Sequence, residues 1–229
     1  MTAGIVTPPA RPAAVVFDCD GVLVDSEPIT NGVLTEMLNE LGIDFDVATT
    51  MRTFMGKSVK DEIGWIERRI GRPLAPDWHP QFVRRRDAAL AARVEAIDGV
   101  AAVIERLAAL GIPFAVASGA DTAKMKITLG RARLLPYFQD RMFGSDMVAR
   151  SKPAPDVYLM AMQHLGVGAA RTIVVEDTPT GTRAGVAAGA TVYGFATVME
   201  PGLLAAAGAI RCFARMAELP PLLGLTAAR

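Results

Sequence analysis

The chain has 229 residues and 51% of them are hydrophobic, so it can bury the core of one sizeable domain or of a domain with an insertion. Lysine plus arginine and aspartate plus glutamate both number 24, which gives a formal net charge of +0. This balance does not favour nucleic-acid binding, which usually needs a basic excess or patch. The two cysteines, Cys19 and Cys212, do not resemble a disulfide framework and suit a reducing cytosol.

Neither end of the chain shows a targeting or membrane-spanning pattern. Residues 1–12 lack a basic and apolar signal sequence, and we interpret them as a flexible tail. The uncharged stretch 184–199 is interrupted by glycines and is shorter than the roughly 20 residues that a membrane span needs. We therefore expect a cytoplasmic protein, a monomer or weak homodimer, that does not bind membranes.

Apolar runs and helical patterns alternate along most of the chain. The run at residues 13–17 is unbroken, which is typical of a strand buried on both faces. The alternation favours an α/β fold with a Rossmann-like parallel sheet and helices on both faces. Later strands are predicted at 113–117, 141–144, 171–175 and 191–195, helices at 100–110, 122–131, 156–165 and 182–188, and a final helix or two after 201.

The region at residues 29–97 breaks this alternation. It contains helical patterns at 29–41, 59–70 and 80–92 and no strand pattern of comparable strength. We interpret it as a helical-bundle cap inserted after the first strand. The predicted division is a tail at 1–12, a catalytic core at 13–28 and 98–229, and a cap insertion at 29–97.

Two carboxylates directly follow the first strand. Asp18 and Asp20 are spaced two residues apart, and Gly21 comes next. Ligands of open α/β sheets bind beyond the carboxyl ends of such strands. Two acids placed close together there are unfavourable unless a cation or a proton offsets the repulsion between their charges. The segment therefore predicts a metal-assisted carboxylate site.

Polar pairs also follow two later strands. Ser118-Gly119 ends one strand and Glu176-Asp177 another, with Lys152-Pro153 in the loop between them. Each has a structural alternative: a simple turn for Ser118-Gly119, a solvated side chain for Lys152, and a helix N-cap for Glu176-Asp177. Their joint occurrence in one order makes these alternatives less favourable.

This order of motifs resembles the haloacid dehalogenase-like superfamily of aspartate-nucleophile hydrolases over about residues 13–195. The insertion after the first motif resembles the cap of a subgroup of small-molecule phosphatases and phosphomutases. That subgroup includes phosphoglycolate phosphatases, β-phosphoglucomutases and 6-phosphogluconate phosphatases. The resemblance implies an enzyme that acts on a small phosphorylated metabolite.

The resemblance also implies roles for the acids. Asp18 would attack phosphorus and form an aspartyl-phosphate intermediate. Asp20 would protonate the leaving alcohol and later deprotonate the attacking water. Mg²⁺ would be held by Asp18, the backbone carbonyl of Asp20, and Asp177, with Glu176 supporting its water shell.

The remaining motif residues would bind the phosphate. By the same resemblance, Ser118 and the Gly119 amide would hold its oxygens. Lys152 would neutralise charge on the nucleophile and on the transferring group.

Two features of the sequence narrow the range of reactions that the resemblance allows. Dehalogenases in this family lack an acid at the position of Asp20, so its presence favours phosphate esters. β-Phosphoglucomutase-like members place a histidine where this chain has residues 28–31, which contain none. This favours hydrolysis, with a phosphomutase as the alternative and a non-catalytic regulatory protein on the same fold as a further one.

Substrate selection is expected in the cap. The loop with Gly56, Lys57 and Ser58 resembles the segment that relatives insert into the active site. Lys57 is a candidate ligand for an anionic or polyhydroxy leaving group, and the alternative is a simply solvated lysine. Sugar phosphates or phosphorylated sugar acids, such as 6-phosphogluconate, fit a cationic loop.

Overall fold

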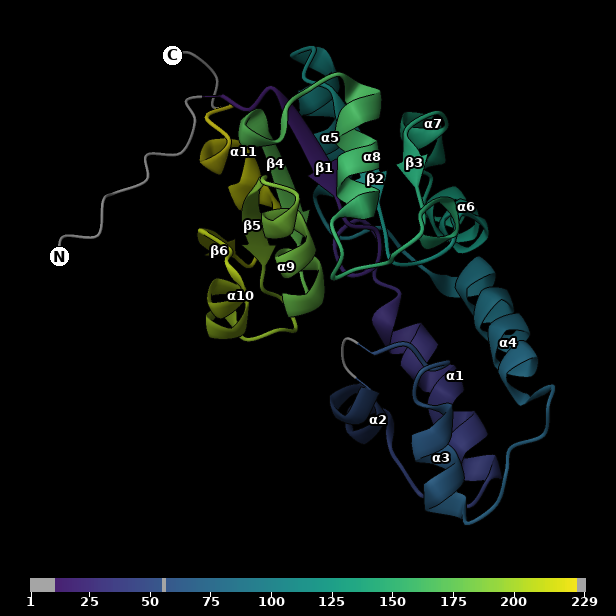
Figure 1. Ribbon diagram of the computed structural model, residues 1–229. Coiled ribbons are helices and arrows are strands. Elements are labelled where there is room, and N and C mark those ends of the chain that lie inside the picture. Colours follow the sequence, from purple (N-terminus) through teal and green to yellow (C-terminus); the bar gives the residue numbers. More distant parts are fainter. Residues whose placement is uncertain (1–10, 55–56, 226–229) are drawn as a thin grey trace, which may run out of the picture.

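The computed structural model describes residues 11–54 and 57–225. Within this part of the chain a six-stranded parallel sheet has the order β3-β2-β1-β4-β5-β6 (Figure 1). Its strands are β1 (Ala14–Phe17), β2 (Phe114–Ala117), β3 (Met142–Phe143), β4 (Thr172–Glu176), β5 (Thr191–Phe195) and β6 (Arg211–Phe213). The predicted Rossmann-like α/β class is confirmed.

Each face of the sheet has its own hydrophobic core. Along β1, Val15 and Phe17 pack into one core, whereas Val16 between them packs into the other. This follows from the alternation of side chains along a strand. Because both faces are covered, the central strands consist largely of apolar residues, which is why their apolar runs predict them correctly.

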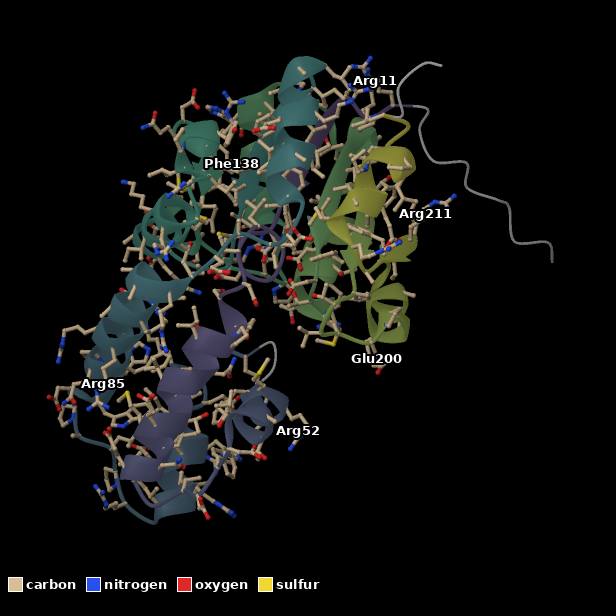
Figure 2. The ribbon with its side chains drawn as sticks, turned by 180° about the vertical axis from the view of Figure 1, so that it is seen from behind. Arg11, Arg52, Arg85, Phe138, Glu200 and Arg211 are labelled. Carbon is tan, nitrogen blue, oxygen red and sulfur yellow. The ribbon has the colours of Figure 1, made fainter. Side chains whose placement is uncertain are left out.

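Helices cover both faces. The helices that follow the inserted region are α5 (Val100–Ala109), α6 (Thr122–Arg131), α7 (Leu135–Phe138), α8 (Asp156–Leu165), α9 (Pro179–Ala187), α10 (Pro201–Ala207) and α11 (Leu219–Leu222). Residues of α5 and α6 belong to the core with Phe17, and residues of α8 and α9 to the core with Val16. Phe138 lies in the interior, whereas Arg85 projects outward (Figure 2).

The inserted region forms a helical lobe at one end of the sheet (Figure 1). It consists of α1 (Glu27–Glu40), α2 (Val47–Phe54), α3 (Ile63–Ile70) and α4 (Trp78–Arg93). These helices share a separate core that includes Leu38, Ile66 and Phe82. The boundaries 13–28, 29–97 and 98–229 stay a prediction, and most of the predicted tail lies outside the described residues.

Helices α2 and α7 and strand β6 were not predicted from the sequence. Helix α2 is short and carries adjacent threonines, which have modest helix propensity. Strand β6 spans only Arg211–Phe213 at the edge of the sheet, where the sequence predicts helix alone. It exists because it pairs with β5, a tertiary contact with no local signal.

The described helices give no membrane-spanning candidate. None of those in residues 11–54 and 57–225 combines the necessary length with sufficient apolar character.

The close packing of α9 on the sheet makes a stability prediction. A Cβ atom at Gly185 would lie 2.8 Å from Cγ2 of Val192 and 3.2 Å from Cγ1 of Val174. We expect Gly185→Ala to lower the free energy of unfolding by about 1–3 kcal/mol in urea denaturation, because the interior is already filled. Gly202→Ala on α10 is the control, since nothing lies within 4 Å of that position. An equal effect of both substitutions would contradict the packing argument.

Candidate active site

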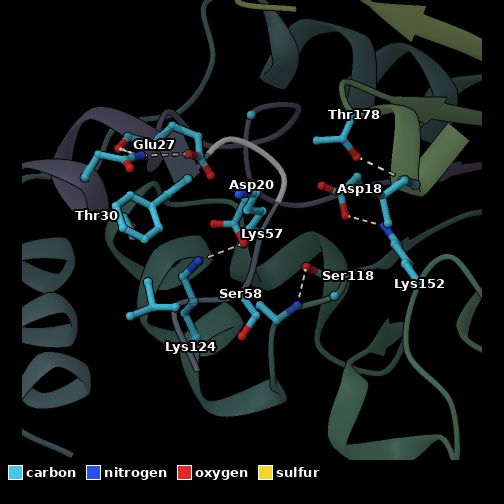
Figure 3. A pocket seen from close by; sticks show the side chains of 18 of the residues that line it. Asp18, Asp20, Glu27, Thr30, Lys57, Ser58, Ser118, Lys124, Lys152 and Thr178 are labelled. Carbon is cyan, nitrogen blue, oxygen red and sulfur yellow. Dashed lines mark hydrogen bonds and ion pairs between the residues drawn. The ribbon is translucent and has the colours of Figure 1, made fainter. Parts of the chain in front are cut away.

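The carboxyl ends of β1, β2 and β4 meet at one edge of the sheet, beneath the helical lobe. A cleft of about 1010 Å³ lies there. Its lining includes Asp18, Ser118, Lys152 and Asp177 from the core and Lys57 from the lobe (Figure 3). The structure thus brings residues distant in sequence to one place, as expected for parallel strands.

Lys152 links two carboxylates at the base of this cleft. Its Nζ atom donates to Oδ1 of Asp18 at 2.6 Å and to Oε1 of Glu176 at 2.7 Å. Burial alone would lower the pKa of Lys152, but the neighbouring Asp18 and Glu176 raise it above its ordinary value. Lys152 is therefore a fixed cation beside Asp18 rather than a solvated side chain.

Glu176 organises the end of β4. Its Oε2 accepts hydrogen bonds from the Asp177 amide and from the amide and hydroxyl of Thr178, each at 3.0 Å. Its Oε1 also accepts a hydrogen bond from the Tyr158 hydroxyl at 2.8 Å. A Cβ atom at Gly181 would lie 1.6 Å from Oε1, so the buried carboxylate needs glycine there. The N-cap of α9 is instead Thr178, whose hydroxyl accepts a hydrogen bond from the Gly181 amide, so the helix-cap alternative for Glu176-Asp177 is wrong.

Asp20 is held by a second, independent set of partners. The hydroxyl of Ser26 donates to its Oδ1, and Nζ of Lys124 donates to its Oδ2 at 2.9 Å. Burial opposes ionisation of Asp20, but Lys124 and the hydrogen bonds outweigh it and lower its pKa below the ordinary value. Asp18 and Asp20 therefore have different lysines as counter-ions.

Ser118 and Gly119 follow β2 at the same edge. Ser118 is buried, and its hydroxyl accepts a hydrogen bond from the Ala120 amide at 3.0 Å. Both Ser118 and Gly119 line the cleft. The Ser118 hydroxyl and the Gly119 backbone amide, in the same cleft as Lys152, can together bind the oxygens of an anion.

The residues around Asp177 fit a divalent cation. Carboxylate oxygens of Asp18, Glu176 and Asp177 lie within 4.8 Å of one another. Among the described residues, Oδ1 of Asp177 is buried without a hydrogen-bond partner. An unsatisfied buried carboxylate oxygen among other acids is the donor type that hard cations prefer.

Gly21 keeps this region open. It has a φ of +78°, and a Cβ atom there would lie 2.0 Å from Oδ2 of Asp177. Glycine is therefore required on both conformational and steric grounds.

The buried acids are costly to ionise. Burial raises the pKa of Asp18 to about 7, although Lys152 opposes the shift. Burial and the neighbouring Glu176 raise the pKa of Asp177 well above its usual range. A cation at these carboxylates would favour their ionised forms.

The predicted cap residues are only partly described. Gly56 lies outside the described residues. Lys57 and Ser58 line the cleft, and Nζ of Lys57 lies 3.6 Å from a carboxylate oxygen of Glu62. The Lys57 side chain remains 47% exposed, so it is available to a ligand.

Sequence reasoning missed several contributors to this site. Ser26 and Lys124, which bind Asp20, and Tyr158, which binds Glu176, are not among the predicted site residues. A signal for Lys124 was available, because a lysine in the first turn after a strand-end loop can face the cleft. Cys19, between the two acids of the first motif, is fully buried, and burial raises its pKa well above the ordinary value.

Comparison with known proteins identifies the class. A family model described as haloacid dehalogenase-like hydrolase matches residues 12–189. The chain therefore belongs to this family, which confirms the resemblance, and it is a phosphatase.

Three similar proteins are described more specifically than the family model. The 6-phosphogluconate phosphatase of Escherichia coli (strain K12) is 33% identical over 187 residues, covering 81% of this chain and 83% of the relative. Fructose-1-phosphate phosphatase YqaB of the same strain is 29% identical over 188 residues, covering 78% and 94%. A crystal structure of a HAD family hydrolase from Deinococcus radiodurans R1, with bound phosphate and sodium, has a TM-score of 0.82 and 33% identity, covering 96% and 100%.

The raised pKa of Asp18 predicts a pH dependence of stability. An acid whose pKa is about 7 when folded and 3.8 when unfolded binds more protons in the folded chain. Its contribution to stability therefore falls as the pH rises through this interval. In chelator-treated protein, we expect a loss of about 2–4 kcal/mol in the free energy of unfolding, which Asp18→Asn removes.

The measurement is urea denaturation of the wild type and of Asp18→Asn at several pH values between the unfolded and the folded pKa of Asp18. Identical pH slopes for the two proteins would show that Asp18 titrates normally. Adding a divalent cation at the upper end should stabilise the wild type more than the variant, because the cation binds ionised carboxylates.

Proposed function

We propose that this phosphatase is Mg²⁺-dependent and hydrolyses small phosphate monoesters through an aspartyl-phosphate on Asp18. The preferred substrates are sugar phosphates or phosphorylated sugar acids such as 6-phosphogluconate. The observation that carries the proposal is the arrangement of Asp18 beside the Lys152 ammonium, with Asp20 held separately in the same cleft.

The first half-reaction transfers the phosphoryl group to the protein. An oxygen of Asp18 forms a bond to phosphorus while the bond from phosphorus to the ester oxygen breaks. The pKa of Asp20 is low in the free protein, and the negative charge of a bound phosphate favours uptake of a proton by its carboxylate. Asp20 then passes this proton to the departing alkoxide. Lys152 offsets the negative charge on Asp18 and on the transferring group, and Ser118 and Gly119 hold the phosphate oxygens.

The second half-reaction restores the enzyme. Asp20, now ionised, takes a proton from water as the water oxygen attacks phosphorus. The bond from Asp18 to phosphorus breaks and inorganic phosphate leaves. Asp20 ends protonated and Asp18 ionised, so protons and charge balance over one turnover.

Asp18, the backbone carbonyl of Asp20, and Asp177 are the proposed ligands of Mg²⁺, with Glu176 holding this segment in place. When bound, the ion supplies positive charge that offsets repulsion between the phosphate dianion and the carboxylates. The unsatisfied oxygen of Asp177 supports this assignment.

The lobe supports the proposed substrate class. Lys57 and Ser58 offer a cation and a hydroxyl to the leaving group on the side of the cleft opposite the sheet. Two similar proteins carry names that specify phosphorylated sugars or sugar acids. A phosphomutase would instead return the phosphoryl group to a second hydroxyl of the sugar, so release of inorganic phosphate separates the two reactions.

The nucleophile makes the primary test. Asp18→Asn should lower kcat for phosphate release by at least about 10⁴-fold, because a carboxamide does not form the acyl-phosphate bond. Wild-type protein incubated with substrate and quenched in acid should carry phosphate on Asp18, detected by mass spectrometry.

The control for this test is Asp140→Asn, which changes an acid that is 76% exposed on the surface. This control should retain wild-type activity. Normal phosphate release by Asp18→Asn would refute the mechanism, whereas conversion of glucose 1-phosphate to its 6-phosphate without net release would favour the phosphomutase.

The cap loop makes a separate substrate prediction. Lys57→Ala should lower kcat/KM for 6-phosphogluconate by about tenfold, because one exposed charged contact to the leaving group is lost. The same variant should hydrolyse 4-nitrophenyl phosphate, which lacks a second anion, with little change. The measurement is phosphate release across a panel of sugar phosphates.

The control is Arg52→Ala, a nearby lobe cation that is not among the residues lining the cleft and extends outward from α2 (Figure 2). An unchanged kcat/KM for every sugar phosphate in Lys57→Ala would eliminate Lys57 as a substrate contact.

A further inference from the structure

The carboxylate of Asp20 is bound at both of its oxygens. The Ser26 hydroxyl donates to one oxygen. Nζ of Lys124 donates to the other at 2.9 Å (Figure 3). A carboxylate bound at one oxygen alone can still rotate about its last side-chain bond. Two donors on different elements instead fix both the position and the plane of the group.

Lys124 is itself firmly placed. Its side chain projects from the first turn of α6, and only 9% of the residue is exposed. Asp121 caps this helix by accepting a hydrogen bond from the Lys124 amide at 2.7 Å. The hydroxyl of Thr128, one turn later, donates to the Lys124 carbonyl at 3.2 Å. The ammonium therefore approaches Asp20 from a rigid platform.

The two lysines of the cleft have separate partners. Lys152 pairs with Asp18 and Glu176, whereas the ion pair of Lys124 is with Asp20. Both lysines are buried, at 8% and 11% side-chain exposure, so water screens neither pair strongly. Each of the two proposed reacting carboxylates thus has its own ammonium.

Resting on the proposed function, we propose that Lys124 is a positioning residue that holds the Asp20 carboxylate toward the leaving-group oxygen. Without this anchor, Asp20 would rotate about Ser26 or turn toward other donors. General acid catalysis needs hydrogen-bond distance to the leaving oxygen, and a misplacement of about 1 Å can reduce the rate about 100-fold. Lys124 would thus act on the rate through Asp20 and not through substrate binding.

The first experiment compares substrates that do and do not need an acid. For Lys124→Met we expect kcat with 6-phosphogluconate to fall about 100-fold, with KM nearly unchanged. The pre-steady-state burst of dinitrophenolate from 2,4-dinitrophenyl phosphate should be unaffected, because this leaving group departs without a proton. Lys124→Arg keeps the charge and donors and should recover much of kcat.

Lys126→Met is the matched control, because Lys126 is exposed on the same helix. This variant should behave as wild type in both assays. Circular dichroism and thermal unfolding of each variant monitor folding.

The second experiment is a double-mutant cycle with Asp20→Asn. If Lys124 acts through Asp20, Lys124→Met should cause no additional loss of 6-phosphogluconate turnover in the Asp20→Asn background. The double variant also removes both charges of the pair, so it keeps no unpaired buried ion and folds even where Lys124→Met does not.

Three results would overturn the role of Lys124. These are a raised KM at constant kcat, an equally slowed dinitrophenolate burst, or a further loss of activity in the Asp20→Asn background. Each would mean that Lys124 contacts the phosphate or the leaving group directly. Normal turnover by Lys124→Met beside an inactive Asp18→Asn would refute this inference alone, whereas an active Asp18→Asn would refute the proposed function.

Discussion

The Lys152 ammonium, placed between the carboxylates of Asp18 and Glu176, is the interaction on which the site depends. Buried acids this close to one another repel strongly, and a buried cation with two charge-assisted hydrogen bonds makes their proximity tolerable. Glu176 in turn binds the backbone that positions Asp177. Removing the lysine would leave uncompensated charge in the interior, so Asp18, the proposed nucleophile, and the proposed cation site depend on the same ammonium.

The sheet supplies the geometric constraint. Strands β1 and β4 are hydrogen-bonded neighbours, with Phe17 opposite Val175, so Asp18 and Glu176 emerge side by side. Because both faces of these strands are covered by packed helices, the acids at their ends have little freedom to move. The proposed catalytic groups therefore project from rigid elements.

The sequence predicts much of this arrangement, for identifiable reasons. Strands such as β1 and β4 have unbroken apolar runs, and polar residues directly after them mark the functional edge. By contrast, β6 is a short edge strand stabilised by pairing with β5, and α2 depends on the other lobe helices, so neither has a strong local pattern. Lys124 lies in the first turn after a strand-end loop, but its pairing with Asp20, 104 positions away, has no local signal.

The sequence by itself determined which chemical groups are present and that they follow strand ends, because burial and backbone geometry leave periodic traces in the chain. Only the tertiary structure decided which lysine pairs with which acid. That choice depends on the direction in which α6 and the Lys152 loop approach the sheet edge, and on the short distances over which ion pairs and hydrogen bonds act. Consequently the two acids of the first motif, alike in sequence, have different surroundings when folded.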